Sequence, residues 1–132
     1  MKRILFIVLL FLVPILSGTP VKTVFYIQQP EAINYYDALI HAVTWVESKH
    51  GLHVWNPLEE AVGWFQIRPI RLQDYNERTG KNYTMQDCFD YNISKEIFLY
   101  FAQGKSYEQA AKNWNGSGPM TLVYWYSVSV KL

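Results

Sequence analysis

The stretch from residue 33 to residue 51 reads INYYDALIHAVTWVESKHG, and it is the most regular segment of the chain. Its apolar side chains recur every three or four residues, at Ile33, Tyr36, Leu39, Ile40, Val43 and Val46. This spacing predicts an amphipathic helix. Pro30 suits the first turn of that helix, and Gly51 suits its end. Lys49 and His50 are favourable at the negative end of the helix dipole.

Glu47 lies at the margin of this apolar stripe, one residue after Val46 and four after Val43. A glutamate at such a position is commonly an ordinary solvated helix residue. If it lines a cleft instead, poor solvation of its carboxylate raises its pKa, and it can then act as an acid near neutral pH. The helix therefore carries a candidate catalytic acid near its end.

The segment Gly63-Trp64-Phe65-Gln66 follows sixteen residues after Glu47. Gly63 gives the backbone freedom for a close turn, and Phe65 offers an apolar wall. Gln66 has both a donor and an acceptor for a sugar amide or hydroxyl. A second polar turn follows Trp114, over residues 115–119. Each pattern alone is weak, because chance and ordinary loop chemistry also explain it.

Three further helices are predicted over about residues 69–80, 84–104 and 106–114. Pro69 opens the first, and glycines close the first and second. The second and third begin with capping-box patterns, Thr84 with Asp87 and Ser106 with Gln109.

The last segment, residues 121–128, reads TLVYWYSV and favours a strand on propensity. A lone strand after several helices would lack a hydrogen-bonding partner, so we expect a helix there. The chain is thus predicted to be a mainly α, single-domain protein.

The N-terminus predicts export. Met1-Lys2-Arg3 precedes an apolar block, Ile4–Leu16, and small residues follow at Ser17-Gly18. This order is typical of a secretory signal, so we expect a signal peptide over 1–18 and a mature domain over 19–132, periplasmic or secreted. Thirteen apolar positions are too few to span a bilayer as a helix, although an uncleaved anchor is the alternative.

The charge and composition of the chain limit the classes of molecule that it is expected to bind. Without Lys2 and Arg3 the chain holds ten basic and eleven acidic residues, so nothing favours nucleic acid as a partner. Aromatic residues make up 17% of the chain, and they can fill a small core or stack on sugar faces.

The lone Cys88 cannot form an internal disulfide, and we expect it to be a small buried hydrophobe. The histidines, His41, His50 and His53, have no third and fourth ligand at a familiar spacing. We therefore expect neither a metal site nor a cofactor.

Five segments, in this order and spacing, resemble the soluble lytic transglycosylase family of lysozyme-like domains. They are Glu47-Ser48, Gly63-Trp64-Phe65-Gln66-Ile67, Asp90-Tyr91-Asn92-Ile93, Trp114-Asn115-Gly116-Ser117-Gly118 and Thr121-x-x-Tyr124-x-x-x-Val128. The resemblance covers about residues 33 to 128. It implies a lysozyme-like helical domain with a groove for a peptidoglycan strand of alternating N-acetylglucosamine and N-acetylmuramic acid.

The resemblance also implies roles. Glu47 matches the acid/base that protonates the glycosidic oxygen and then takes the proton of the muramoyl C6 hydroxyl, which forms a 1,6-anhydro ring without water. The expected substrate-binding residues are Ser48, Phe65, Gln66, Asn115 and Tyr124. For Ser48, a helix-end hydroxyl bonded to its own backbone is an equal alternative. We expect a monomer whose partner is the glycan strand, with cell-envelope machinery as a further possibility.

Two departures from the family pattern would reshape the groove: Trp64-Phe65 stands where leucine-methionine is usual, and Trp114 where tyrosine is common. The number of carboxylates at the site distinguishes a lytic transglycosylase from a hydrolytic muramidase, since the muramidase needs a second carboxylate near the glycosidic bond. Its candidates are Glu59, Glu60 and Asp74. A non-catalytic peptidoglycan-binding component of a secretion, conjugation or phage apparatus is the remaining alternative.

Overall fold

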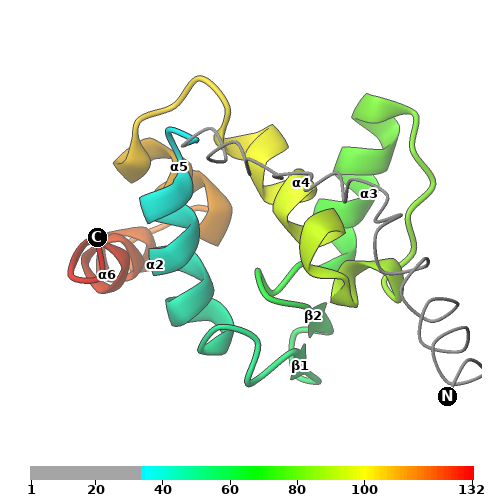
Figure 1. Ribbon diagram of the computed structural model, residues 1–132, viewed down its shortest axis with the longest axis horizontal. Helices are drawn as coiled ribbons and strands as arrows, with labels where there is room; N and C mark the ends of the chain where they lie inside the picture. The colour runs from blue at the N-terminus through cyan, green and yellow to red at the C-terminus, as the bar shows by residue number, and fades with distance from the viewer. Residues whose placement is uncertain (1–33) are drawn as a thin grey trace, which may run out of the picture. The chain divides into compact units, whose positions relative to one another are not determined.

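The computed structural model describes residues 34–132, and the predicted signal peptide lies outside the described residues. The described chain is mainly helical with one two-stranded antiparallel sheet, which confirms the predicted fold class at the level of mainly α (Figure 1). Its elements are α2 (Asp37–Ser48), β1 (Trp55–Asn56), β2 (Ala61–Val62), α3 (Pro69–Thr79), the 3-10 turn η1 (Asp87–Phe89), α4 (Tyr91–Ala102), α5 (Tyr107–Asn115) and α6 (Met120–Ser129).

Helix α2 is shorter than predicted at both ends. It begins at Asp37, because the Asn34 side chain accepts the Tyr36 backbone N–H at 2.9 Å and the Asp37 carboxylate accepts the Asn34 N–H at 2.8 Å. These bonds hold the residues before Asp37 in a turn instead of a helix. The helix ends at Ser48, and Lys49 follows in a left-handed conformation with φ 53°. The observed end is therefore three residues before Gly51, where the sequence predicted it.

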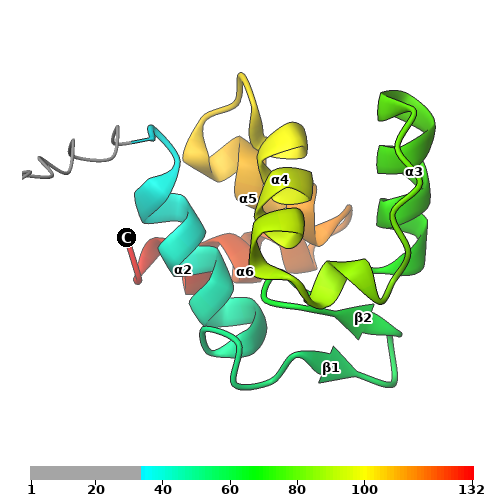
Figure 2. The ribbon, with the colours of Figure 1, turned by 45° about the vertical axis from the view of Figure 1, so that its right-hand side comes forward.

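The core lies where α2, α4, α5 and α6 meet, and α3 flanks α4 (Figure 2). The apolar face of α2 supplies Leu39 and Val43, which are fully buried with Phe98 of α4 and Val128 of α6. The predicted apolar stripe of this helix is therefore the face that packs. Cys88 is also fully buried, as expected.

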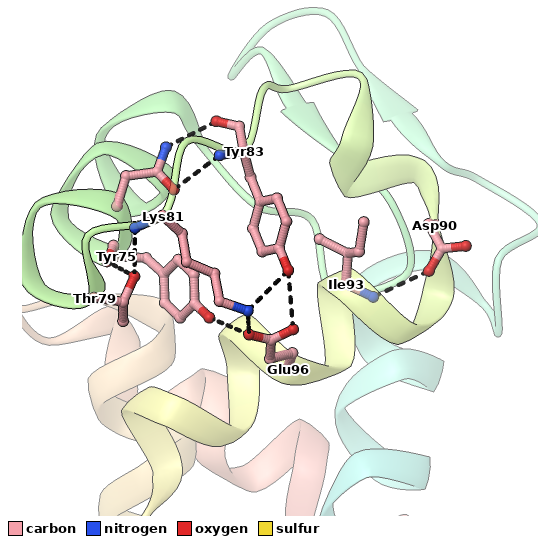
Figure 3. A network of polar contacts seen from close by, with 8 residues as sticks. Tyr75, Thr79, Lys81, Tyr83, Asp90, Ile93 and Glu96 are labelled. Carbon is pink, nitrogen blue, oxygen red and sulfur yellow. Dashed lines mark hydrogen bonds and ion pairs between the residues drawn. The ribbon is translucent and has the colours of Figure 1, made fainter.

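A cluster around Glu96 ties α3 to α4 (Figure 3). The Glu96 carboxylate accepts a hydrogen bond from Tyr75 Oη at 2.5 Å and one from Tyr83 Oη at 3.2 Å, and it also pairs with Lys81. These donors lower the pKa of Glu96. The loop between α3 and η1 is thus fixed at the surface of α4.

The helix boundaries follow their caps. The Ser106–Gln109 capping box is present at the start of α5, and α3 spans the segment predicted from Pro69 to Gly80. Thr84 and Asp87 also form hydrogen bonds with each other, but the element that begins there is the short 3-10 turn η1 and not the predicted long helix. Asp90 accepts the N–H groups of Asn92 and Ile93 and begins α4 instead, which corrects the predicted helix start.

The C-terminal segment is helical, as expected against its strand propensity. Val128 of α6 is fully buried, and Tyr124 and Trp125 pack partly against the core. Packing on α2 and α5 therefore outweighs local preference. Within residues 34–132, none of the helices has the length and hydropathy needed to cross a bilayer.

Candidate active site

A cavity of about 460 Å³ separates α3 from the ends of α2 and α5. Helix α3 contributes a mostly polar wall, in which Arg71, Gln73, Asp74 and Glu77 accompany the apolar Ile70. The rest of the lining comes from Glu47, Gln66, Arg68, Trp114, Asn115 and Gly116. The cavity volume lies within the ~300–1,000 Å³ range of small-ligand sites.

Glu47 lies in the last turn of α2 with its carboxylate at this cavity. Desolvation raises the pKa of Glu47 from 4.5 to about 7, against the hydrogen bond from Tyr124 and the charge of Arg68, which both lower it. The nearby charge of Glu59 adds a small increase. A carboxyl group with this pKa is present in both protonation states near neutral pH, which an acid that later acts as a base requires.

Tyr124 reaches Glu47 from the inner side of α6. Its Oη donates to Glu47 Oε1 at 2.6 Å. Burial, and next the charge of Glu47, raise the pKa of Tyr124 well above 10, so the phenol keeps its proton and remains a donor. The predicted acid and the predicted tyrosine, 77 residues apart in the chain, are therefore direct partners.

Gln66 lines the cavity from a strained backbone, φ 50°. Its Nε2 donates to Gly63 O at 2.9 Å and to His53 O at 3.2 Å. Both amide hydrogens are therefore used within the loop, while the amide oxygen accepts no hydrogen bond from the described residues. What Gln66 offers a ligand is an acceptor for a hydroxyl or an acetamido N–H.

Gly63 allows the Gln66 loop to pack closely on η1. At φ 78°, a Cβ on Gly63 would lie 2.0 Å from the backbone oxygen of Cys88. That oxygen also accepts a hydrogen bond from Ser94 Oγ at 2.5 Å. Only glycine fits this close contact, which confirms the turn predicted at Gly63.

Three of the five predicted substrate-binding residues do not line the cavity. Tyr124 lies behind Glu47 as its hydrogen-bond donor, and Ser48 and Phe65 belong to the scaffold. Ser48 is 1% exposed; its Oγ donates to Trp64 O at 2.8 Å and accepts the Gly51 N–H at 2.9 Å. Phe65 is fully buried and stacks on Phe98 at 4.9 Å between ring centroids. Ser48 was expected at the ligand because it matches the serine after the family's acid, but its Oγ also lies 3.2 Å from Thr44 O of its own helix, which favours the helix-end alternative. Phe65 was expected as an apolar wall of the site, but it packs in the core.

Asn115, the last residue of α5, lines the cavity together with Gly116. Two side chains hold this end of α5 in place. Trp114 Nε1 donates to Phe65 O at 3.1 Å, and Arg71 Nη2 donates to Asn113 O at 3.0 Å. The Arg71 guanidinium also lies 5.2 Å from the Trp114 ring centroid. The end of α5 that bears Asn115 is therefore attached both to the Gln66 loop and to α3.

Sequence reasoning missed the two arginines, Arg68 and Arg71. Arg68 lowers the pKa of Glu47 and pairs with Glu59 at 2.7 Å, while Arg71 orders the end of α5. The sequence did hold a signal for them. Both arginines lie in the segment Arg68-Pro69-Ile70-Arg71, directly after the Gln66 loop. Because Pro69 predicts that a helix begins there, its first turn must lie beside the site that contains Gln66.

Of the three candidate second carboxylates, Asp74 lines the cavity, and Glu59 and Glu60 do not. Asp74 accepts from Arg78 Nε at 2.6 Å. Glu77, which the sequence reasoning did not consider, lines the same wall. Among residues 34–132 no three His, Cys, Asp or Glu side chains gather in a metal-binding arrangement.

Comparison of the chain with known protein families, curated proteins and solved structures finds no significant match.

Proposed function

We propose that this protein is an exported lytic transglycosylase with a lysozyme-like fold, which cleaves the β-1,4 bond between N-acetylmuramic acid and N-acetylglucosamine in peptidoglycan. One observation carries the proposal: a single desolvated carboxyl, Glu47, faces a polar cavity with its pKa raised to about 7. The resemblance of the five sequence segments adds the substrate class.

The proposed reaction uses Glu47 twice. Its protonated carboxyl gives a proton to the bridging oxygen as the glycosidic bond to muramoyl C1 breaks. The resulting carboxylate takes the proton of the C6 hydroxyl while that oxygen bonds to C1, which closes the 1,6-anhydro ring. Glu47 ends as it began and no water is consumed. The hydrogen bond from Tyr124 supports the charged intermediate form of the carboxylate.

Substrate binding is assigned to Gln66 and Asn115. The unused amide oxygen of Gln66 can accept from a sugar hydroxyl or acetamido N–H, and the Asn115 amide supplies both a donor and an acceptor. No cofactor enters this chemistry.

A hydrolytic muramidase is the second candidate, because Asp74 and Glu77 line the same cavity as Glu47. A second carboxylate near the bond could act on a water or on the sugar itself. The two activities differ in product: anhydromuramoyl ends for the transglycosylase and reducing ends for the hydrolase.

The test is mass spectrometry of the products after incubating purified peptidoglycan with the protein, with Glu47→Gln and with the control Glu60→Gln. We expect anhydromuramoyl products from the parent and from Glu60→Gln, and a loss of at least ~10²-fold for Glu47→Gln. Glu60 is exposed and outside the cavity lining, so its variant controls for loss of a charge alone.

Other outcomes would contradict the proposal. Reducing-end products that vanish in Asp74→Asn would establish the hydrolase. No soluble product, with the protein still sedimenting with the wall, would indicate a non-catalytic peptidoglycan-binding component of a larger envelope apparatus.

A further inference from the structure

Helix α6 is apolar on both sides, although residues 34–132 cover only one of them. Val128 and Tyr124 on the inner side meet the core and Glu47. On the outer side four large side chains, each 55% to 69% exposed, share one face: Leu122, Val123, Tyr126 and Val130. Their spacing of one, four and eight residues spans about 100° of the helix. We call these four residues the α6 outer face.

The α6 outer face is continuous with a cationic edge. Lys131 lies between exposed Val130 and Leu132, and its Nζ is 5.4 Å from the Trp45 ring centroid. Lys49 Nζ lies 5.0 Å from the same ring. Neither lysine joins an ion pair with the other described residues. Partly exposed Trp45 therefore lies close to two lysines that have no ion-pair partner among the described residues.

Acidic side chains are missing from this part of the sequence. Glu108 is the last Asp or Glu in the sequence, so residues 109–132 have no acidic side chain. Of the two lysines there, Lys112 pairs with Glu108 and Lys131 joins no ion pair with the described residues. In a chain with eleven acidic residues, this asymmetry leaves the exposed apolar face without the negative charges that would repel an anionic surface.

We propose that the α6 outer face, with Trp45, Lys49 and Lys131 at its edge, docks on an anionic lipid surface. Exposed aliphatic side chains on one face, amphipathic Trp and Tyr rings, and lysines at the rim are the features of helices that lie in the membrane interface. The lysines would meet anionic headgroups while the apolar side chains enter the boundary with the acyl chains.

A lipid surface fits better than a second copy of the chain. An isologous dimer would bring Lys49 and Lys131 of both copies into one interface with no acidic side chain from residues 109–132 to pair with them. The inference rests on the α6 outer face and not on Glu47, so it stands independently of the proposed glycan cleavage.

The test uses a fluorophore on the full chain. A polarity-sensitive dye is attached to Val123→Cys on α6 and, as the matched control, to Arg78→Cys, an exposed position on α3. Native Cys88 is fully buried and is not labelled in the folded protein. Because the reporter is local, capture of the protein by its apolar N-terminal segment would not imitate docking of α6. If Val123→Cys does not fold by circular dichroism, Tyr126→Cys replaces it.

With phosphatidylglycerol vesicles, we expect a blue shift and quenching by spin-labelled lipid at position 123 but not at position 78. Phosphatidylcholine vesicles should give a much weaker response, and added salt should reduce the phosphatidylglycerol response. The double variant Leu122→Ser/Val130→Ser should weaken the response of a dye at position 126 roughly tenfold, because it removes apolar area that would be buried in lipid.

Three results would overturn the inference. One is the absence of a vesicle-dependent change at position 123, and another is an equal change at positions 123 and 78. The third is a blue shift at position 123 that grows with protein concentration without vesicles, which would identify a second copy as the occupant.

Discussion

At the scale of single residues, the environment of Glu47 sets the pKa of its carboxyl group. Its neighbours act in opposite directions: burial disfavours the carboxylate, while the Tyr124 hydroxyl and Arg68 favour it. Burial prevails, so the pKa of the carboxyl is about 7 instead of 4.5. Each neighbour that is removed should therefore move the pH dependence in a defined direction.

Replacing Tyr124 with Phe should raise the apparent pKa on the alkaline side of the pH–rate profile. In the parent protein this hydrogen bond stabilises the charged form of Glu47. Without it, the pKa of Glu47 should rise above its value of about 7. Turnover should fall because the carboxylate that forms after the first proton transfer loses its partner. Tyr126→Phe, on the exposed side of the same helix, is the control. An alkaline limb that stays in place in Tyr124→Phe would contradict the role given to this hydroxyl.

Glu47→Gln should stabilise the protein near neutral pH. The carboxyl has a higher pKa folded than unfolded, so its stabilising effect is complete below about pH 4.5 and is lost as the pH rises through about 7. Glutamine carries no charge to desolvate and can still accept from Tyr124. We expect a gain of about 1–3 kcal/mol at neutral pH that disappears at the acid end of this window.

Urea unfolding of the parent and of Glu47→Gln at both pH values measures this difference. An equal difference at the two pH values would mean that the titration of Glu47 does not affect stability. A loss of stability at neutral pH would mean that the carboxylate is better solvated than its position indicates.

At the scale of elements, the turn from β2 to α3 is the part that needs one particular residue. The Gly63 N–H donates to Val54 O at 2.8 Å while its Cα faces the backbone of η1. The turn aims Gln66 at the cavity and Phe65 at the core. The backbone path of the Gly63–Gln66 turn therefore determines which of its side chains can contact a ligand.

Gly63→Ala should cost at least ~3 kcal/mol in unfolding free energy, because the new Cβ would lie 2.0 Å from a backbone oxygen that cannot move freely. Gly80→Ala is the matched control: its φ is also positive, 73°, but nothing lies within 4 Å of the added Cβ. That control should cost only about 1 kcal/mol. Denaturant titration of both variants tests the prediction, and similar losses would show that backbone strain alone explains Gly63.

At the scale of the whole described unit, the cavity exists because α3 is anchored to elements far away in sequence. The Glu96 cluster joins α3 and its following loop to α4. Arg71 joins α3 to the end of α5 through carbonyls 42 and 43 residues away. These two attachments, at different turns of α3, hold its polar wall at the cavity.

Arg71→Ala should lower the unfolding free energy by roughly 1–2 kcal/mol, since two hydrogen bonds and contacts with the Phe101 and Trp114 rings are lost. It should also raise KM for glycan fragments roughly tenfold, because Asn115 is no longer held at the site. Arg78→Ala removes an exposed arginine from the same helix and should leave the free energy of unfolding nearly unchanged, because exposed ion pairs contribute little. Steady-state kinetics and urea unfolding of both variants provide the check, and an unchanged KM in Arg71→Ala would restrict that residue to a structural role.

The sequence alone determined the features that depend on local chemistry. Apolar spacing predicted the packed face of α2, the Ser106–Gln109 pair predicted the start of α5, and Pro69 with Gly80 bounded α3. Helix periodicity placed Glu47 at the margin of the apolar stripe, and the resemblance of the five segments made it the candidate acid.

Only the tertiary structure decided which side chains reach the cavity. Phe65 and Gln66 are neighbours in the sequence, but the tight turn directs the first into the core and the second to the cavity, and no periodicity encodes that difference. The contact of Tyr124 with Glu47 and the bond from Arg71 to the end of α5 depend on packing between distant segments. The pKa of Glu47 likewise depends on burial by those segments, because desolvation is a property of the folded surroundings and not of the residue itself.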